Sequence, residues 1–289
     1  MHVNTSREVL GDPLGLAGVV ILGLLAGMAL LAPLLAGSHP DYYTGQIFVS
    51  PSADHPLGTD SVGQDIWSRL LWGARTSLLA GAGVALISTL LSVLIGATSA
   101  IFGGLYDRFW MRVVDTMLAI PSIIVMMLVA AYLHPNLVLL ILLLSAFSWP
   151  GGARIVRAQT LTIKDRMHVY AASTFGAGSG HILHRHVVPD LAPIILAVMI
   201  GDARRAVFME AGLSFLGISD PGMVSWGKIM HQALPFTYLE VWKWWLLPAG
   251  LALSLTLVGL SFLGYALEAA MDPRLRASEK KENARIINA

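Results

Sequence analysis

The sequence predicts an all-α membrane protein with about six transmembrane helices. Hydrophobic residues make up 55% of its 289 residues and charged residues only 13%, whereas soluble domains carry about 25% charged residues. The mean hydropathy is +0.67. So few charged residues cannot form the polar surface that a soluble protein needs. This composition is typical of integral membrane proteins.

Six apolar stretches approach the length of about 20 residues that a helix needs to cross a bilayer. They are roughly 14–36, 77–103, 112–133, 136–151, 191–217 and 244–268. Arg7 precedes the first stretch as it would precede a signal peptide, but the apolar run exceeds the about 7–15 residues of a signal core. We therefore expect the first stretch to remain as a transmembrane helix.

The distribution of Lys and Arg predicts the orientation of these helices. Of the 19 basic residues, 13 fall in one set of alternating connections and four in the other, while Arg204 and Arg205 lie inside a span. The positive-inside rule places the connections richer in Lys and Arg, and both termini, on the cytoplasmic side of the cell membrane. The expected organisation is a cytoplasmic N-terminus (1–13), a transmembrane domain (14–268) and a cytoplasmic tail (269–289).

The connection between the fourth and fifth spans is long, polar and rich in glycine. It runs from about Gly151 to Pro189, whereas most connections between helices need about 2–8 residues, so a loop of this length is usually functional or disordered. Apolar residues alternate with charges from Arg154 to Ser173, which predicts a helix lying against other structure. A glycine-broken turn and a second short helix should follow before Pro189.

This connection resembles the EAA loop of permeases of the ATP-binding cassette (ABC) importers, in which Glu-Ala-Ala leads by fixed spacing to a glycine and to Ile-x-Leu-Pro. The resemblance is carried by Tyr170, Ala171, Ala172, Gly176, His186, Val188 and Pro189. Tyr170 replaces the glutamate, His186 the isoleucine and Val188 the leucine. The resemblance implies that the loop at 152–190 is cytoplasmic and forms the coupling helix, which docks into a cleft of the ATPase.

Two further stretches narrow the resemblance to the peptide/nickel group of these permeases. His55–Leu78 is similar to the segment before that group's second span, and Glu210–Gly217 with Trp226-Gly227 is similar to the end of its fifth. The closing Asp272-Pro273-Arg274 is also similar to that group. Together these motifs resemble the second of the two permeases that such importers pair.

The resemblance implies a type I ABC importer permease fold and a subunit without catalytic residues or cofactor. Its implied partners are the lipid bilayer, a homologous second permease, two ATPase subunits that hydrolyse ATP, and an extracytoplasmic binding protein. Short peptides are the first cargo it implies, and nickel or a metal chelate is the alternative.

Four charged residues in the fifth span need a separate explanation. They are Asp202, Arg204, Arg205 and Glu210. A charge at the centre of a span costs about 2.5–3.5 kcal/mol, while each large apolar residue returns about 0.3–0.6 kcal/mol. The span must therefore lie inside a bundle or along a wet path. Helical spacing allows Asp202 to pair with Arg205 and turns Arg204 away. The charges either satisfy one another or line a translocation path, and the sequence leaves both alternatives open.

Other sites and functions are less well supported. The glycines at 176–180 follow no strand and precede no Gly-Lys-Ser/Thr, so a phosphate loop is not indicated. His181, His184 and His186 lie two, three and five residues apart and cannot share one helical face, so we expect a docking surface rather than a metal site. The chain has no cysteine, which excludes thiolate-bound metal centres. The sequence has no stripe of basic residues that would indicate a nucleic-acid partner.

Two other classes of function are alternatives to a permease. An ion-coupled secondary transporter would explain intramembrane charge, but no repeat of three spans is visible. An intramembrane enzyme is disfavoured because no span carries Gly-x-Ser-x-Gly or His-Glu-x-x-His.

The external segment, about His39 to Arg75, is acidic and turn-rich. We expect Asp65–Leu78 to form an amphipathic helix along the outer interface, where it either receives a binding protein or only leads into the second span. Trp242, Trp244 and Trp245 should form an aromatic belt at the outer end of the sixth span.

Overall fold

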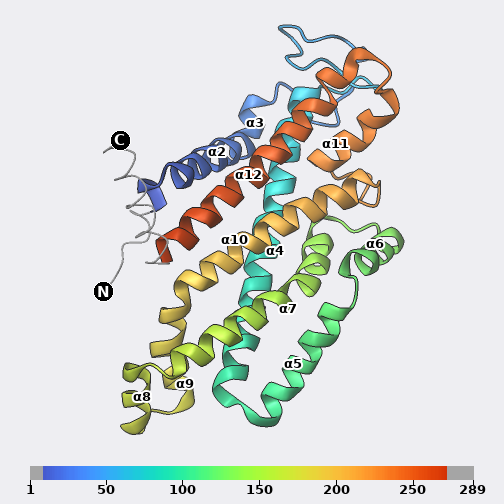
Figure 1. Ribbon diagram of the computed structural model, residues 1–289. Helices are drawn as coiled ribbons and strands as arrows, with labels where there is room; N and C mark the ends of the chain where they lie inside the picture. The colour runs from blue at the N-terminus through green and yellow to red at the C-terminus, as the bar shows by residue number, and fades with distance from the viewer. Residues whose placement is uncertain (1–8, 272–289) are drawn as a thin grey trace, which may run out of the picture.

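Long, tilted helices pack side by side in the computed structural model, which describes residues 9–271 (Figure 1). Within this described part of the chain, five helices are long and apolar enough to cross a membrane. They are α2 (Pro13–Leu30), α4 (Ile66–Phe102), α7 (Leu137–Lys164), α10 (Val188–Phe215) and α12 (Leu246–Met271). A sixth span is formed if α5 (Gly104–Ala119) and α6 (Ser122–Leu133), which meet at 77°, cross together. The predicted all-α membrane fold is confirmed.

Short helices fill the connections. They are α3 (Ala32–Leu35), α8 (Met167–Thr174), α9 (Ser179–Ile182), the π-helical turn η1 (Leu183–Val187), α11 (Trp226–Ala233) and the 3₁₀ turns η2 (Leu234–Phe236) and η3 (Glu240–Lys243). Residues 37–65 and α11 lie at one end of the bundle and α8 and α9 at the other (Figure 1). Val9 packs on Ala266 and Leu267, so the described chain begins and ends on the same side. Residues 1–8 and 272–289, with Asp272-Pro273-Arg274, lie outside the described part.

Polar caps and prolines set the helix boundaries. Asp65 caps α4 by accepting the backbone N–H of Ser68 at 2.8 Å, and Asn136 caps α7 in the same way, as short polar residues do at helix starts. The third span, expected as one helix over 112–133, is instead broken. Pro121 forces the preceding Ile120 into an extended conformation, which the ring of a following proline favours.

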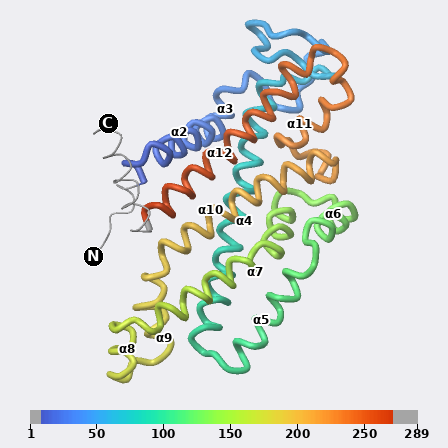
Figure 2. The backbone as a smooth tube through the Cα atoms, in the orientation of Figure 1, coloured from blue at the N-terminus to red at the C-terminus, as the bar shows by residue number. Residues whose placement is uncertain are grey.

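The helix α4 passes through the middle of the bundle and behind α10 (Figure 2). It packs against α7, α10 and α2. Three buried clusters lie along it: one around Ile66, Leu70, Trp226, Ile229 and Trp245, one around Val84, Leu140, Leu144, Ala206 and Leu213, and one around Ala97, Val156, Ile163, Val187 and Leu191. Every cluster joins residues from at least three parts of the chain, so the spans form one body.

The expectation of an interfacial helix over Asp65–Leu78 is wrong. These residues are the first turns of α4 and continue directly into the span. Ile66 and Ala74 are 1% exposed and Leu70 6%, because α11 and α12 cover them. The alternative, a segment that leads into the second span, is what the structure shows.

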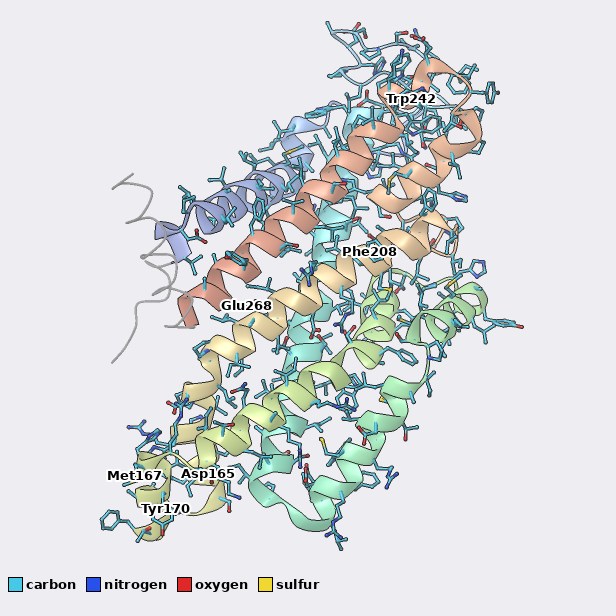
Figure 3. All side chains as sticks on the ribbon, viewed as in Figure 1. Asp165, Met167, Tyr170, Phe208, Trp242 and Glu268 are labelled. Atoms are coloured by element: carbon cyan, nitrogen blue, oxygen red, sulfur yellow. The ribbon has the colours of Figure 1, made fainter. Side chains whose placement is uncertain are left out.

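The expected belt of three tryptophans is also only partly right. Trp245 is buried and its ring stacks on that of Phe236, with ring centres 5.7 Å apart. Trp242 and Trp244 remain partly exposed, and Figure 3 shows Trp242 at the end of the bundle that carries residues 37–65.

The helix α7 extends beyond the apolar stretch 136–151 and ends only at Lys164. Two ion pairs hold this extension against α5: Arg157 with Asp107 at 2.5 Å, and Arg154 with Asp115 at 2.5 Å. The first part of the expected loop is therefore a continuation of α7, and the connection proper comprises residues 165–187.

Candidate functional site

The connection 165–187 is a structured hairpin of short helices. The first, α8, ends with Gly176 at φ +85°. The N–H of Ala177 donates to the carbonyl of Ala172 at 3.1 Å, and that of Gly176 to Ser173 at 3.0 Å. This is the Schellman ending of a helix, in which a left-handed glycine follows the last turn. Gly176 thus follows Ala172 by the four residues that this helix ending requires.

Buried apolar residues anchor the connection to the spans. Val169 of α8 is 2% exposed. It packs with Ile182 and Val187 against Ile163 of α7 and Leu191 of α10. Because both arms of the hairpin share this cluster with two long helices, the hairpin is held as part of the bundle.

An acidic residue at the start of α10 reinforces this anchor. Asp190 Oδ2 accepts from Arg166 Nη1 at 2.8 Å and lies 3.2 Å from His168 Nε2. Arg166 and His168 flank the start of α8, and Asp190 follows Pro189 in the first turn of α10. The start of α8 is therefore tied to the start of α10, and Pro189 takes the first-turn position that proline tolerates.

Large side chains of the connection point away from the bundle. Met167 is 82% exposed, Tyr170 65% and Phe175 91%, and Figure 3 shows Met167 and Tyr170 at the free end of the molecule. Ala171 is exposed beside them, and Ala172 and His186 are half-buried. Exposed apolar groups gathered on a polar loop mark an interaction surface. The sequence drew attention to Tyr170, but gave no sign that Met167 and Phe175 of the same connection are also exposed.

The histidines of the connection come closer than their spacing suggested. The rings of His181 and His186 are 5.9 Å apart, and those of His168 and His186 are 6.2 Å apart. His184 is exposed. Between residues 9 and 271 no three His, Asp or Glu side chains are placed to hold a metal ion.

The four charges of α10 lie on two different faces. Asp202 and Glu210 are buried toward α4. Ser88 donates to Asp202 Oδ2 at 2.6 Å, and Ser77 donates to Glu210 Oε2 at 2.9 Å. Ser214 donates to the other oxygen of Glu210 at 2.8 Å. The sequence analysis missed these serines, although several small polar residues in an apolar span are themselves a signal of contact with a polar neighbour.

Arg204 and Arg205 face outward. Arg205 Nη1 lies 3.9 Å from Asp202 Oδ1, the predicted i,i+3 pair. Arg204 instead donates to Ser261 Oγ of α12 at 3.2 Å. Both arginines line a hollow of about 360 Å³ together with Phe208, whose ring Figure 3 places on the open face of α10. The two carboxyl groups are therefore buried and the two cations are exposed, and Arg205 remains paired with Asp202.

Replacing Glu210 with alanine should destabilise the fold. The change leaves the buried hydroxyls of Ser77 and Ser214 without an acceptor, and each buried unpaired group costs about 1–3 kcal/mol. Glu210→Gln keeps one carbonyl oxygen and should cost less. The melting temperature of the purified protein measures both changes. The exposed Glu240 provides the control Glu240→Ala, and equal melting temperatures for all three variants would contradict the structural role.

The opposite end of the bundle is held by a buried polar network. Arg69, in the first turn of α4, pairs with Asp60 at 3.3 Å and donates to Gln232 of α11 at 2.6 Å. Asp60 also accepts the backbone N–H of Gln64 at 2.8 Å. This network fixes residues 37–65 over the end of α4 and beside α11. Burial lowers the pKa of the nearby Lys228, and the positive charge of Arg69 adds to the decrease.

The apolar helices of the bundle define a multi-pass membrane protein. The chain belongs to the family of binding-protein-dependent transport system inner membrane components, whose model matches residues 88–277. It therefore has the type I ABC importer permease fold. Membership in this family sets aside the ion-coupled secondary transporter.

Two relatives are similar over nearly the whole chain. The oligopeptide transport system permease protein OppC of Bacillus subtilis (strain 168) is 35% identical over 269 residues, covering 92% of this chain and 87% of that protein. The dipeptide transport system permease protein DppC of the same organism is 35% identical over 275 residues, covering 93% of this chain and 85% of that protein. Both are named for peptides and neither for nickel.

Proposed function

We propose that this chain is one of two permease subunits of an ATP-driven importer of short peptides. In this proposal a homologous second permease completes the translocation path and an extracytoplasmic binding protein delivers the peptide. The complex holds two ATPase subunits, one of which docks on the connection 165–187 of this chain. The chain itself performs no bond chemistry. The names of the two relatives support peptides, so the nickel alternative is not favoured.

The observation that carries the proposal is the anchored, outward-facing connection. Its exposed side chains, Met167, Tyr170 and Phe175, provide the apolar contact that a docking partner would cover. Its buried side and the pairs to Asp190 join it to α7 and α10. A displacement of a bound ATPase would therefore move these spans rather than bend a flexible loop.

The orientation follows from the same assignment. An ATPase works in the cytoplasm, which places the loop at 152–190, the N-terminus (1–13) and the tail (269–289) on that side of the cell membrane. The transmembrane domain then comprises 14–268. The excess of Lys and Arg on this side supports the assignment.

The outward cations of α10 are proposed to face the path. Of the four charged residues, Asp202 and Glu210 are covered by α4 in this conformation, so Arg204 and Arg205 are the ones that a passing solute could meet. At the other end, exposed Tyr42, Tyr43 and Ile47 form the surface we assign to the binding protein.

Native mass spectrometry can test the subunit composition that this proposal predicts. When the chain is expressed with its operon, extracted in mild detergent and analysed by native mass spectrometry, we expect one second permease and two ATPase subunits beside it. Vesicles holding this complex and its binding protein should take up a labelled dipeptide only with ATP. Recovery of this chain alone would contradict the proposal, and so would uptake of nickel without uptake of peptide.

A further inference from the structure

A second, larger hollow lies between α10, α12 and the first turn of α2. Its volume is about 550 Å³, within the range of about 300–1,000 Å³ of ligand pockets. Leu14, Ile200, Phe262 and several small residues form most of its wall. Two side chains of opposite charge complete it, Arg204 of α10 and Glu268 of α12, and Figure 3 shows Glu268 on α12.

Polar groups of α12 line this hollow at helical spacing. Ser261, Tyr265 and Glu268 are four and three residues apart, so they lie in one row along the helix. Ser261 accepts a hydrogen bond from Arg204. The row therefore begins beside a cation, passes a phenol and ends at a carboxylate.

Among the described residues, no opposite charge forms an ion pair with either charge of this hollow. Within residues 9–271, the ion pairs of the structure include neither Arg204 nor Glu268, and both side chains are exposed. An unpaired arginine in a span is too costly to face lipid, and such residues almost always face a cavity or the bundle interior. This hollow thus offers one site for an anion and one for a cation.

The spacing along α12 between Ser261, which Arg204 contacts, and Glu268 is similar to the length of a short peptide. Glu268 follows Ser261 by seven residues, which is about 10 Å along a helix at 1.5 Å per residue. An extended chain of two to three residues spans about 7–11 Å at 3.3–3.6 Å per residue.

We propose that this hollow is a subsite for both charged ends of a di- or tripeptide, with Arg204 binding the terminal carboxylate and Glu268 the terminal ammonium group. The hydroxyls of Ser261 and Tyr265 face the peptide between them. This subsite rests on the proposed function and adds to it a preference for peptides whose two ends are free.

Peptide binding to the purified permease–ATPase complex, without the binding protein, tests the subsite by titration calorimetry. The probes are dialanine, dialanine amide and N-acetyl-dialanine. Wild type should bind dialanine about ten-fold or more tightly than either blocked form, because each blocked end loses a charge-assisted contact. Arg204→Gln should remove the preference over the amide only, and Glu268→Gln the preference over the acetylated form only.

Three controls keep this test decisive. Arg112→Gln, an exposed arginine of α5 outside the hollow, should keep both preferences. Arg204→Lys and Glu268→Asp keep the charges and should keep part of each preference, which separates recognition from folding. Unchanged preferences in Arg204→Gln and Glu268→Gln, with ATP-dependent dipeptide uptake still present in wild type, would overturn the subsite alone. Absence of dipeptide uptake in wild type would overturn the proposed function itself.

Discussion

Phe175→Asp is expected to abolish ATP-coupled uptake while the helical bundle still assembles. The side chain is 91% exposed, and substitutions at such surface positions usually change stability by no more than about 0.5 kcal/mol. In the proposed docking, a carboxylate at this position would be buried without a partner, which is strongly unfavourable. The effect should therefore fall on the docked complex and not on the fold of this chain.

Three measurements on the same preparation check this expectation: ATPase subunits retained on purification, ATP hydrolysis in vesicles, and uptake of labelled dipeptide. Tyr238→Asp is the matched control, because Tyr238 is a 78% exposed aromatic residue. It lies between η2 and η3, and Phe236 of η2 packs on Phe48 in the segment 37–65 at the opposite end of the bundle. This control should retain its ATPase subunits. Wild-type retention and uptake in Phe175→Asp would show that the ATPase docks elsewhere.

A bulky charge at Ala172 should act in the same direction, since Ala172 lies half-buried in the turn that closes α8. Gly176 is a less clean target. Its φ of +85° strains any other residue, so a change there would alter the shape of the connection as well as its surface.

The sequence was sufficient for the spans and for the outline of the connection. Composition and the length of apolar stretches predicted the membrane fold, because a helix that crosses a bilayer must satisfy its own backbone. The apolar residues interleaved with charges from Arg154 to Ser173 predicted a helix, and the glycines after it predicted a turn, since both depend on local hydrogen bonds. The structure divides the predicted helix between the end of α7 and α8. The break in the third span was not predicted, although Pro121 is the residue in the sequence that causes it.

Features that depend on distant residues were beyond the sequence. The burial of Ile66 and Leu70 depends on α11, and Trp226 Nε1 donates to the carbonyl of Leu70 at 3.1 Å. Before the packing is known, an apolar stretch that begins a span is indistinguishable from one lying on a membrane surface. The pairing of Asp202 with Arg205 was predictable because it is local, whereas Ser88 is 114 residues from Asp202 in the chain.

The hollow beside Arg204 shows the same limit. Arg204 was recognised as a charge turned away from its neighbours, because helical spacing alone decides this. Glu268 drew no attention, since a carboxylate near the end of a span is unremarkable until another helix brings a cation to the same cavity.

Gly227→Ala is expected to disrupt the end of the bundle that carries α11. A Cβ at Gly227 would lie 2.3 Å from the carbonyl oxygen of Ala211 and 2.8 Å from its Cα. These are backbone atoms of α10, so no side chain can turn aside to make room. Excess volume in a packed core costs about 1–3 kcal/mol and occasionally more, and a rigid neighbour favours the upper end.

This clash should propagate because α11 carries other contacts that depend on its position. Moving α11 from α10 would separate Trp226 from the carbonyl of Leu70 and Gln232 from Arg69. We therefore expect a lower melting temperature and a lower yield of the assembled complex on size exclusion. Gly212→Ala is the matched control, since a Cβ there meets nothing within 4 Å and alanine favours a helix over glycine. Equal melting temperatures for Gly227→Ala and Gly212→Ala would show that close packing at Gly227 does not hold α11 in place.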